Sequence, residues 1–85
     1  MIPLMSQRRF IECSSDPRKF AEEMLLHPVG SPSWSSLGCL YALGCLIRGL
    51  ELEKANELIE VLIQLDPSRA EGLRAAQRRA QTSQD

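Results

Sequence analysis

Residues 31–50 read SPSWSSLGCLYALGCLIRGL and residues 51–67 read ELEKANELIEVLIQLDP, and these two stretches decide the fold of the 85-residue chain. The first is apolar almost throughout, and the second alternates apolar and charged residues with a helical period. Gly49 separates them, and glycine is the residue that most readily ends a helix in the left-handed conformation. The pair therefore predicts a helical hairpin.

The first helix of this hairpin has clear ends and more than one apolar face. Ser31 is suited to cap the first turn and Pro32 to the first helical position, while Arg48 and Gly49 end the helix. Apolar residues recur at spacings of three and four on two faces, which are Trp34, Leu37, Tyr41 and Cys45 on one and Leu40, Leu43 and Ile47 on the other. A helix that is apolar on several sides must be covered on several sides.

The second helix is predicted over 52–65. Its apolar stripe consists of Ala55, Leu58, Ile59, Leu62 and Leu65, widened by Val61 and Ile63. Glu51 and Glu53 place negative charge near its start, which the helix dipole favours. Asp66-Pro67 stops this helix and caps the next one.

The flanking segments predict two further helices. Asp16-Pro17 starts one that runs to about His27, and Pro67 starts a final helix that is rich in Ala and Arg. Leu73 is the only large apolar residue of the final helix, so we interpret that helix as a polar cap. Its arginines form a solvated face or, alternatively, contact an acidic partner. We expect residues 1–13 to be flexible or ordered by a partner, 14–81 to form a single domain, and 82–85 to fray. The predicted class is all-α, with three to four helices.

The hairpin resembles the tetratricopeptide (TPR) repeat. Lys54-Ala55, Ile59, Leu62 and Leu65-Asp66-Pro67 are similar to the second half of that repeat. Trp34, Leu37-Gly38 and Tyr41 match its start but lie five residues too far from Ala55; anchored on Ala55, those positions fall on Cys39, Ala42-Leu43 and Leu46 instead. The resemblance implies antiparallel hairpins stacked as a short solenoid, with the register of 32–48 left open.

A narrower resemblance concerns the small chaperones of the type III secretion needle subunit. The run CLYALGCLIRGLELEKANELIEVLIQLDPSRAEGLR, residues 39–74, looks like their C-terminal half. This resemblance implies a cytoplasmic chaperone that holds a self-associating needle subunit in a heteromeric complex, with a second small chaperone sharing the work.

Composition excludes several other classes. A net charge of −1 argues against nucleic-acid binding driven by phosphate neutralisation. Three cysteines without a CxxC spacing favour a reducing compartment or plain core thiols over a disulfide framework. The N-terminus lacks the pattern of a secretory signal, and the uncharged run 37–47 is about half the length that crosses a bilayer. We expect a cytoplasmic protein without a membrane span.

The inventory of reactive residues does not favour catalysis. His27 is the only histidine, and it precedes Pro28 at a predicted helix end. One histidine and three scattered cysteines make no convincing metal set, and Gly44 to Gly49 lacks the Lys-Ser/Thr of a phosphate loop. We expect no enzyme activity, cofactor or metal.

The remaining feature is the surplus of apolar surface on the first hairpin helix. So short a chain covers a limited fraction of its surface, and we expect an amphipathic helix of a partner protein to cover the rest. The candidate partner-binding residues are Leu40, Leu43, Ile47, Trp34 and Tyr41. The alternative is a structural adaptor or homodimerising TPR-like scaffold subunit that uses the same surface without chaperone activity.

Overall fold

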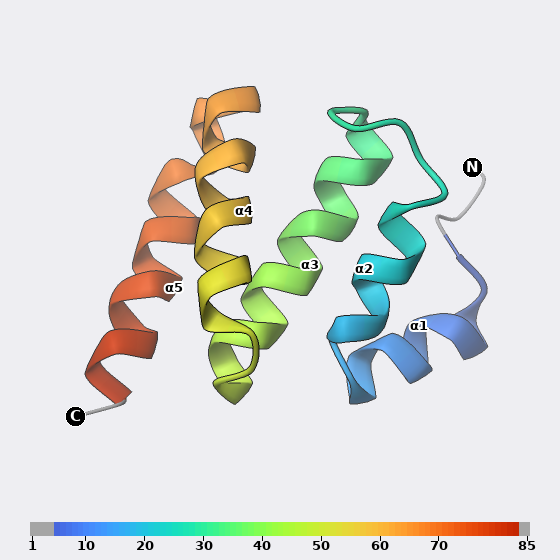
Figure 1. Cartoon of the computed structure of the whole chain (residues 1–85), viewed down its shortest axis with the longest axis horizontal. Helices are drawn as coiled ribbons and strands as arrows, with labels where there is room; N and C mark the ends of the chain where they lie inside the picture. Colours follow the sequence, from blue (N-terminus) through green and yellow to red (C-terminus); the bar gives the residue numbers. More distant parts are fainter. Residues whose placement is uncertain (1–4, 84–85) are drawn as a thin grey trace.

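The structure is a computed structural model that describes residues 5–83, and all regular elements in this range are helical (Figure 1). In chain order they are α1 (Gln7–Ser15), α2 (Arg18–Met24), α3 (Pro32–Arg48), α4 (Leu52–Leu65), the short 3-10 helix η1 (Pro67–Arg69) and α5 (Ala70–Ser83). The predicted all-α class is confirmed. The described residues form five α-helices, where the sequence predicts three to four.

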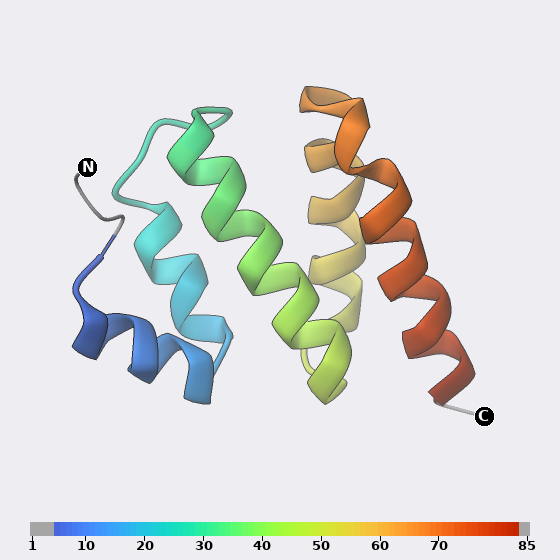
Figure 2. The same cartoon turned by 180° about the vertical axis from the view of Figure 1, so that it is seen from behind.

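Helix α3 is the central element, with α2 packed on one side and α4 and α5 on the other (Figures 1 and 2). Its ends follow from local sequence. The Ser31 hydroxyl accepts a hydrogen bond from the Trp34 amide at 3.2 Å, and Gly49 adopts a left-handed φ of 69°. The Leu50 amide then donates to the Cys45 carbonyl at 2.9 Å, which closes the C-terminal turn. Both predicted ends are confirmed.

Helix α4 runs antiparallel to α3, as the hairpin prediction requires (Figure 1). Ala55, Ile59 and Leu62 of the predicted stripe are completely buried. Leu65, at the end of the stripe, remains 49% exposed. The predicted bounds, 52 and 65, are both confirmed.

The N-terminal segment differs from the sequence-based expectation. Residues 7–15 form α1, where the sequence predicts a flexible or partner-ordered segment up to residue 13. The Ser6 hydroxyl caps this helix, Cys13 is completely buried, and Arg9 Nε donates to Glu23 Oε1 of α2 at 2.7 Å. Residues 7–13 therefore belong to a helix that contacts α2; residues 1–4 lie outside the described residues.

Helix α2 is shorter than predicted. It ends at Met24, whereas the sequence predicts a helix to about His27. The amides of Leu25, Leu26 and His27 donate to carbonyls only three residues back, so the chain tightens instead of continuing as an α-helix. Pro28 explains this difference, because a proline disfavours helical backbone at the residue before it.

The C-terminal helix begins with a 3-10 turn. Asp66 Oδ1 accepts hydrogen bonds from the amide of Ser68 at 3.1 Å and from its hydroxyl at 2.6 Å, as expected of a capping aspartate. From Ala70, α5 runs in the same direction as α3 on the face shown in Figure 2. It includes Thr82 and Ser83, where the sequence predicts fraying, and residues 84–85 are not among those described.

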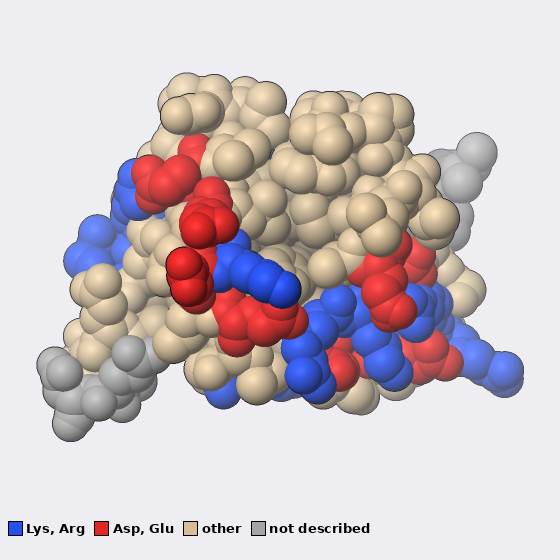
Figure 3. All heavy atoms as spheres, viewed as in Figure 1, with Lys and Arg blue, Asp and Glu red and all other residues tan. Residues whose placement is uncertain are grey.

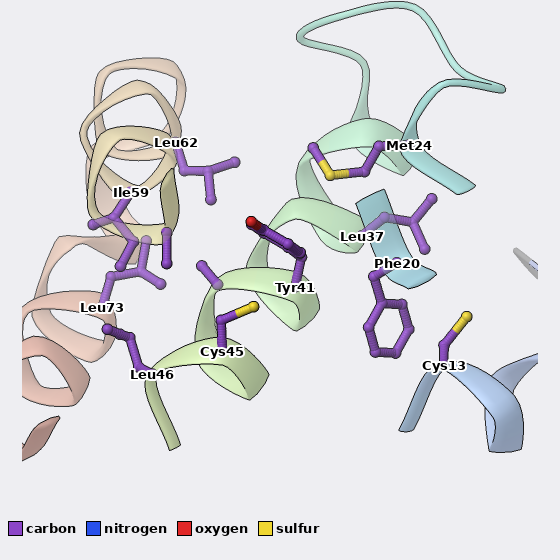
Figure 4. Packing of buried hydrophobic residues seen from close by; sticks show 12 residues of the cluster. Cys13, Phe20, Met24, Leu37, Tyr41, Cys45, Leu46, Ile59, Leu62 and Leu73 are labelled. Carbon is purple, nitrogen blue, oxygen red and sulfur yellow. The ribbon is translucent and has the colours of Figure 1, made fainter. Parts of the chain in front are cut away.

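The core lies on both flanks of α3 (Figure 4). On the α2 flank, Phe20 and Met24 meet Leu37; on the other, Ile59 and Leu73 meet Leu46. Tyr41 and Cys45 lie between these groups and are 5% and 0% exposed. One apolar face of α3 therefore joins the two halves of the molecule.

Candidate partner-binding groove

An apolar groove of about 480 Å³ runs between α3 and α5. We call it the α3–α5 groove. It is lined by Leu43, Leu46 and Ile47 of α3 and by Gly72, Ala75, Ala76, Arg79 and Ala80 of α5. The two walls differ in the size of their side chains, because α3 contributes large residues and α5 contributes almost only small ones.

The groove exists because the side chains of α5 on this side are too small to cover α3. The helix contacts α3 mainly through Leu73, which is 4% exposed, and through Ala76 and Ala80 at the edge of the core. Beside that contact, Ile47 remains 82% exposed and Leu43 half-buried. A methyl group added at Gly72 would meet no atom within 4 Å, so this wall is open.

The outer edge of the groove is basic. Arg79 lines the α3–α5 groove and also a neighbouring hollow with Ala75, Arg78 and Thr82. On the opposite edge of α5, Arg74 instead bonds Glu60 of α4, with Nη2 and Oε1 at 2.9 Å. The hydrogen bond from Arg74 holds the pKa of Glu60 below its usual value. Among the residues that the structure describes, Glu60 of α4 therefore neutralises Arg74, whereas no acidic side chain pairs with Arg78.

The five sequence-predicted contact residues fall in different environments. Leu43 and Ile47 line the groove together. Leu40 lies on α3 at 36% exposure without lining the groove, and Trp34 is half-buried against the core near the start of α3. Tyr41 is a correction, because it is 5% exposed and its hydroxyl donates to Glu51 Oε2 at 3.4 Å inside the fold. Tyr41 is therefore a core residue, and its face of α3 is turned inward.

Sequence reasoning missed the second wall of the groove. The residues of α5 that form it are small and recur at helical spacing, namely Gly72, Ala75, Ala76 and Ala80. The interpretation of this helix as a polar cap overlooked that spacing. The signal was present in the sequence, since small residues at i, i+3, i+4 and i+8 fall on one helix face.

A second exposed apolar region lies at the opposite end of α3. Leu25, Leu26 and Val29, in the connection between α2 and α3, are 86%, 73% and 79% exposed. Gly30 of the same connection approaches Leu65 at the end of α4. No Lys, Arg, Asp or Glu occurs between Met24 and Ile47, and Figure 3 shows charged side chains gathered instead over α4 and over the α1–α2 end of that face.

Within the described residues, the three cysteines lie in different environments, with Cys13 and Cys45 buried and Cys39 partly exposed. Burial raises the pKa of the Cys13 and Cys45 thiols, which disfavours the nucleophilic thiolate. Cys39 Sγ accepts a hydrogen bond from Arg69 Nη1 at 3.1 Å. Within residues 5–83, no three His, Cys, Asp or Glu side chains come together as a metal site would require.

Over the same described range, no helix combines the length and apolar character that crossing a bilayer demands. No protein-family model, curated protein or solved structure matches the chain.

Proposed function

We propose that the protein binds an amphipathic helix of another protein in the α3–α5 groove and so shields a surface through which that partner would associate with itself. The observation that supports this proposal is the open pair Leu43 and Ile47 beside a wall of small side chains. Large apolar side chains of a partner helix would fit against Gly72 and Ala75, because those residues leave the space unfilled.

Burial of the groove would supply useful binding free energy. Covering about 200 Å² of apolar surface is worth roughly 5 kcal/mol gross at about 25 cal/mol per Å². The loss of translational and rotational freedom on association offsets much of this binding free energy, so the groove alone supports moderate affinity. Binding would also stabilise the small domain itself, since a ligand of the folded state shifts the unfolding equilibrium.

The sequence resemblance gives this proposal its specific form. We propose a cytoplasmic, TPR-like chaperone of a type III secretion needle subunit, working in a heteromeric complex with a second small chaperone. The antiparallel α3–α4 pair, followed by α5 alongside α3, is compatible with stacked hairpins. The groove supports a helical guest, and the resemblance alone supports the identity of that guest.

The test uses two matched substitutions at exposed branched residues. Ile47→Asp places a charge in the groove, and Val29→Asp places the same charge on a residue of similar exposure, 79% against 82%, outside it. The readout is light scattering of a purified type III needle subunit mixed with each variant. We expect wild type and Val29→Asp to keep the subunit monomeric and Ile47→Asp to fail, because docking would remove water from a carboxylate at a position where the partner helix needs an apolar contact. Equal protection by all three proteins would contradict the proposal.

Sedimentation velocity of the pure chain separates the chaperone from the alternative scaffold role. A chaperone with an open groove is expected to be monomeric at low concentration and to form a one-to-one complex when the needle subunit is added. A tight homodimer at every concentration, abolished by Ile47→Asp, would instead assign the groove to a second copy of the chain.

A further inference from the structure

We propose that the helix bound in the α3–α5 groove carries acidic side chains along the flank that faces the last two turns of α5. This inference rests on the proposed function and adds the charge of the partner to it. The feature that supports it is a difference in charge between the two walls of the groove.

The α3 wall carries no charge beside the groove. Its large lining residues, Leu43, Leu46 and Ile47, belong to a stretch from 24 to 47 that has no acidic or basic side chain apart from His27. A partner helix therefore meets only apolar or neutral groups on that side. Charges on the α3 flank of the partner would lose water without gaining an ionic contact there.

The α5 wall is basic over its second half. Arg79 lines the groove, and Arg78 lines the adjoining hollow together with Ala75 and Thr82. Both arginines are exposed at the surface of the described structure. Arg78 makes no ion pair with any described residue, in contrast to Arg74, whose charge Glu60 neutralises. A carboxylate on a docked helix would supply the missing partner at Arg78.

The acidic flank is expected at one end of the groove only. Glu71, an exposed residue in the first turn of α5, lies seven positions before Arg78, which corresponds to roughly 10 Å along the helix. Carboxylates of a partner near Glu71 would be repelled, and those near Arg78 would be attracted. The groove therefore favours one placement of the partner's charges along α5.

The net charge of the chain predicts the opposite preference, so one binding experiment distinguishes the two explanations. The whole chain carries a net charge of −1, so nonspecific attraction would favour a basic peptide. The probes are two synthetic amphipathic helices with the same leucine stripe, one flanked by glutamates and the other by lysines. We expect the full-length chain to bind the glutamate-flanked helix about tenfold more tightly at low salt, with the preference shrinking as salt is added.

Arg78→Glu is the decisive variant, and Arg8→Glu is its control. Arg8 is an exposed arginine on α1, and its reversal changes the net charge by the same amount. Arg78→Glu is expected to abolish or reverse the preference, and Arg8→Glu to retain it. Circular dichroism melts check that both variants fold, which the exposure of both side chains predicts.

The possible failures of the two proposals are distinguishable. If both peptides bind wild type equally, or if Arg8→Glu abolishes the preference as Arg78→Glu does, the acidic-flank inference is overturned and helix binding stands. If neither peptide binds, and the needle subunit does not bind either, the groove proposal falls together with this inference.

Discussion

Gly44 determines how closely the start of α2 approaches α3. A β-carbon placed at Gly44 would lie 2.6 Å from Cβ of Pro17, a separation that real β-carbons essentially never show. Pro17 is itself fully buried, so it has little room to move. The glycine therefore allows Pro17, at the start of α2, to pack directly against α3.

Substituting this glycine tests that close approach. Gly44→Ala should destabilise the fold by about 1–2 kcal/mol, because overpacking exceeds the gain in helix propensity. Gly72→Ala is the matched control, since nothing lies within 4 Å of its added carbon, and it should stabilise the fold by up to about 1 kcal/mol. Urea unfolding measures both. Stabilisation by both substitutions would show that Pro17 does not crowd α3.

Tyr41 illustrates a residue whose chemistry follows from burial. Burial is the main cause that raises the pKa of its hydroxyl from 10.0 to about 12, with the nearby Cys45 and Glu51 adding to the effect. The folded state therefore holds this proton more tightly than the unfolded chain does. Its contribution to stability is complete below pH 10 and is lost as the pH rises from 10 towards 12.

The corresponding prediction concerns alkaline unfolding. The free energy of unfolding should fall between pH 10 and 12 more steeply in wild type than in Tyr41→Phe, which has no proton to lose at this position. Because a side-chain hydrogen bond couples Cys45 to Tyr41, both proteins are compared in a Cys45→Ala background, so that the difference isolates Tyr41. Identical slopes in denaturant titrations across this range would contradict the burial of the hydroxyl.

At the scale of elements, the helices differ in how far local sequence determines them. The ends of α3 and α4 are predictable because Ser31, Gly49 and Asp66 act on their own neighbouring residues. Helix α1 is not predictable in this way, because its contacts are with α2. Arg9 forms an ion pair with Glu23, and Phe10 packs edge-to-face against Phe20. Local patterns cannot show contacts between residues ten or more positions apart.

The residues of the candidate site also differ in how far the sequence predicts their positions. Leu43 and Ile47 were predictable, because a helix that is apolar on two faces has one face to spare. The inward position of Tyr41 was not, since nothing in the periodicity of α3 shows which face meets α2 and α4. The spacing of Gly72, Ala75, Ala76 and Ala80 indicates a small face on α5, but only the inward packing of Leu73 shows that this face lies beside Ile47.

The α3–α4 crossing offers a prediction at this scale. Ala55 is completely buried where the two helices pack, so Ala55→Leu should destabilise the chain by about 1–3 kcal/mol through overpacking. Glu57→Leu places the same side chain at an exposed position of α4 and should change stability by less than about 0.5 kcal/mol. Thermal unfolding followed by circular dichroism compares them. Equal melting temperatures would contradict the close packing of α3 and α4 at Ala55.

At the scale of the whole molecule, the apolar surplus is divided between core and surface. The face of α3 with Leu37, Tyr41 and Cys45 is satisfied within the chain. The face of α3 with Ile47 is left exposed by the described residues. The connection between α2 and α3, with Leu25, Leu26 and Val29, is also exposed. Of these exposed regions, the α3–α5 groove has two helical walls and a charged edge, which are the features that a docked helix would use.

The most direct test fills the groove without weakening the fold. Gly72→Leu adds a bulky side chain to the open wall and replaces a glycine in the first turn of α5, so the free energy of unfolding should rise by up to about 1 kcal/mol. The measurement is fluorescence anisotropy of a labelled leucine-stripe helix titrated with wild type and with Gly72→Leu. We predict that the variant is more stable and binds at least about tenfold more weakly, because its leucine occupies the guest's space. Unchanged affinity in the stabilised variant would contradict the claim that this groove receives a partner helix.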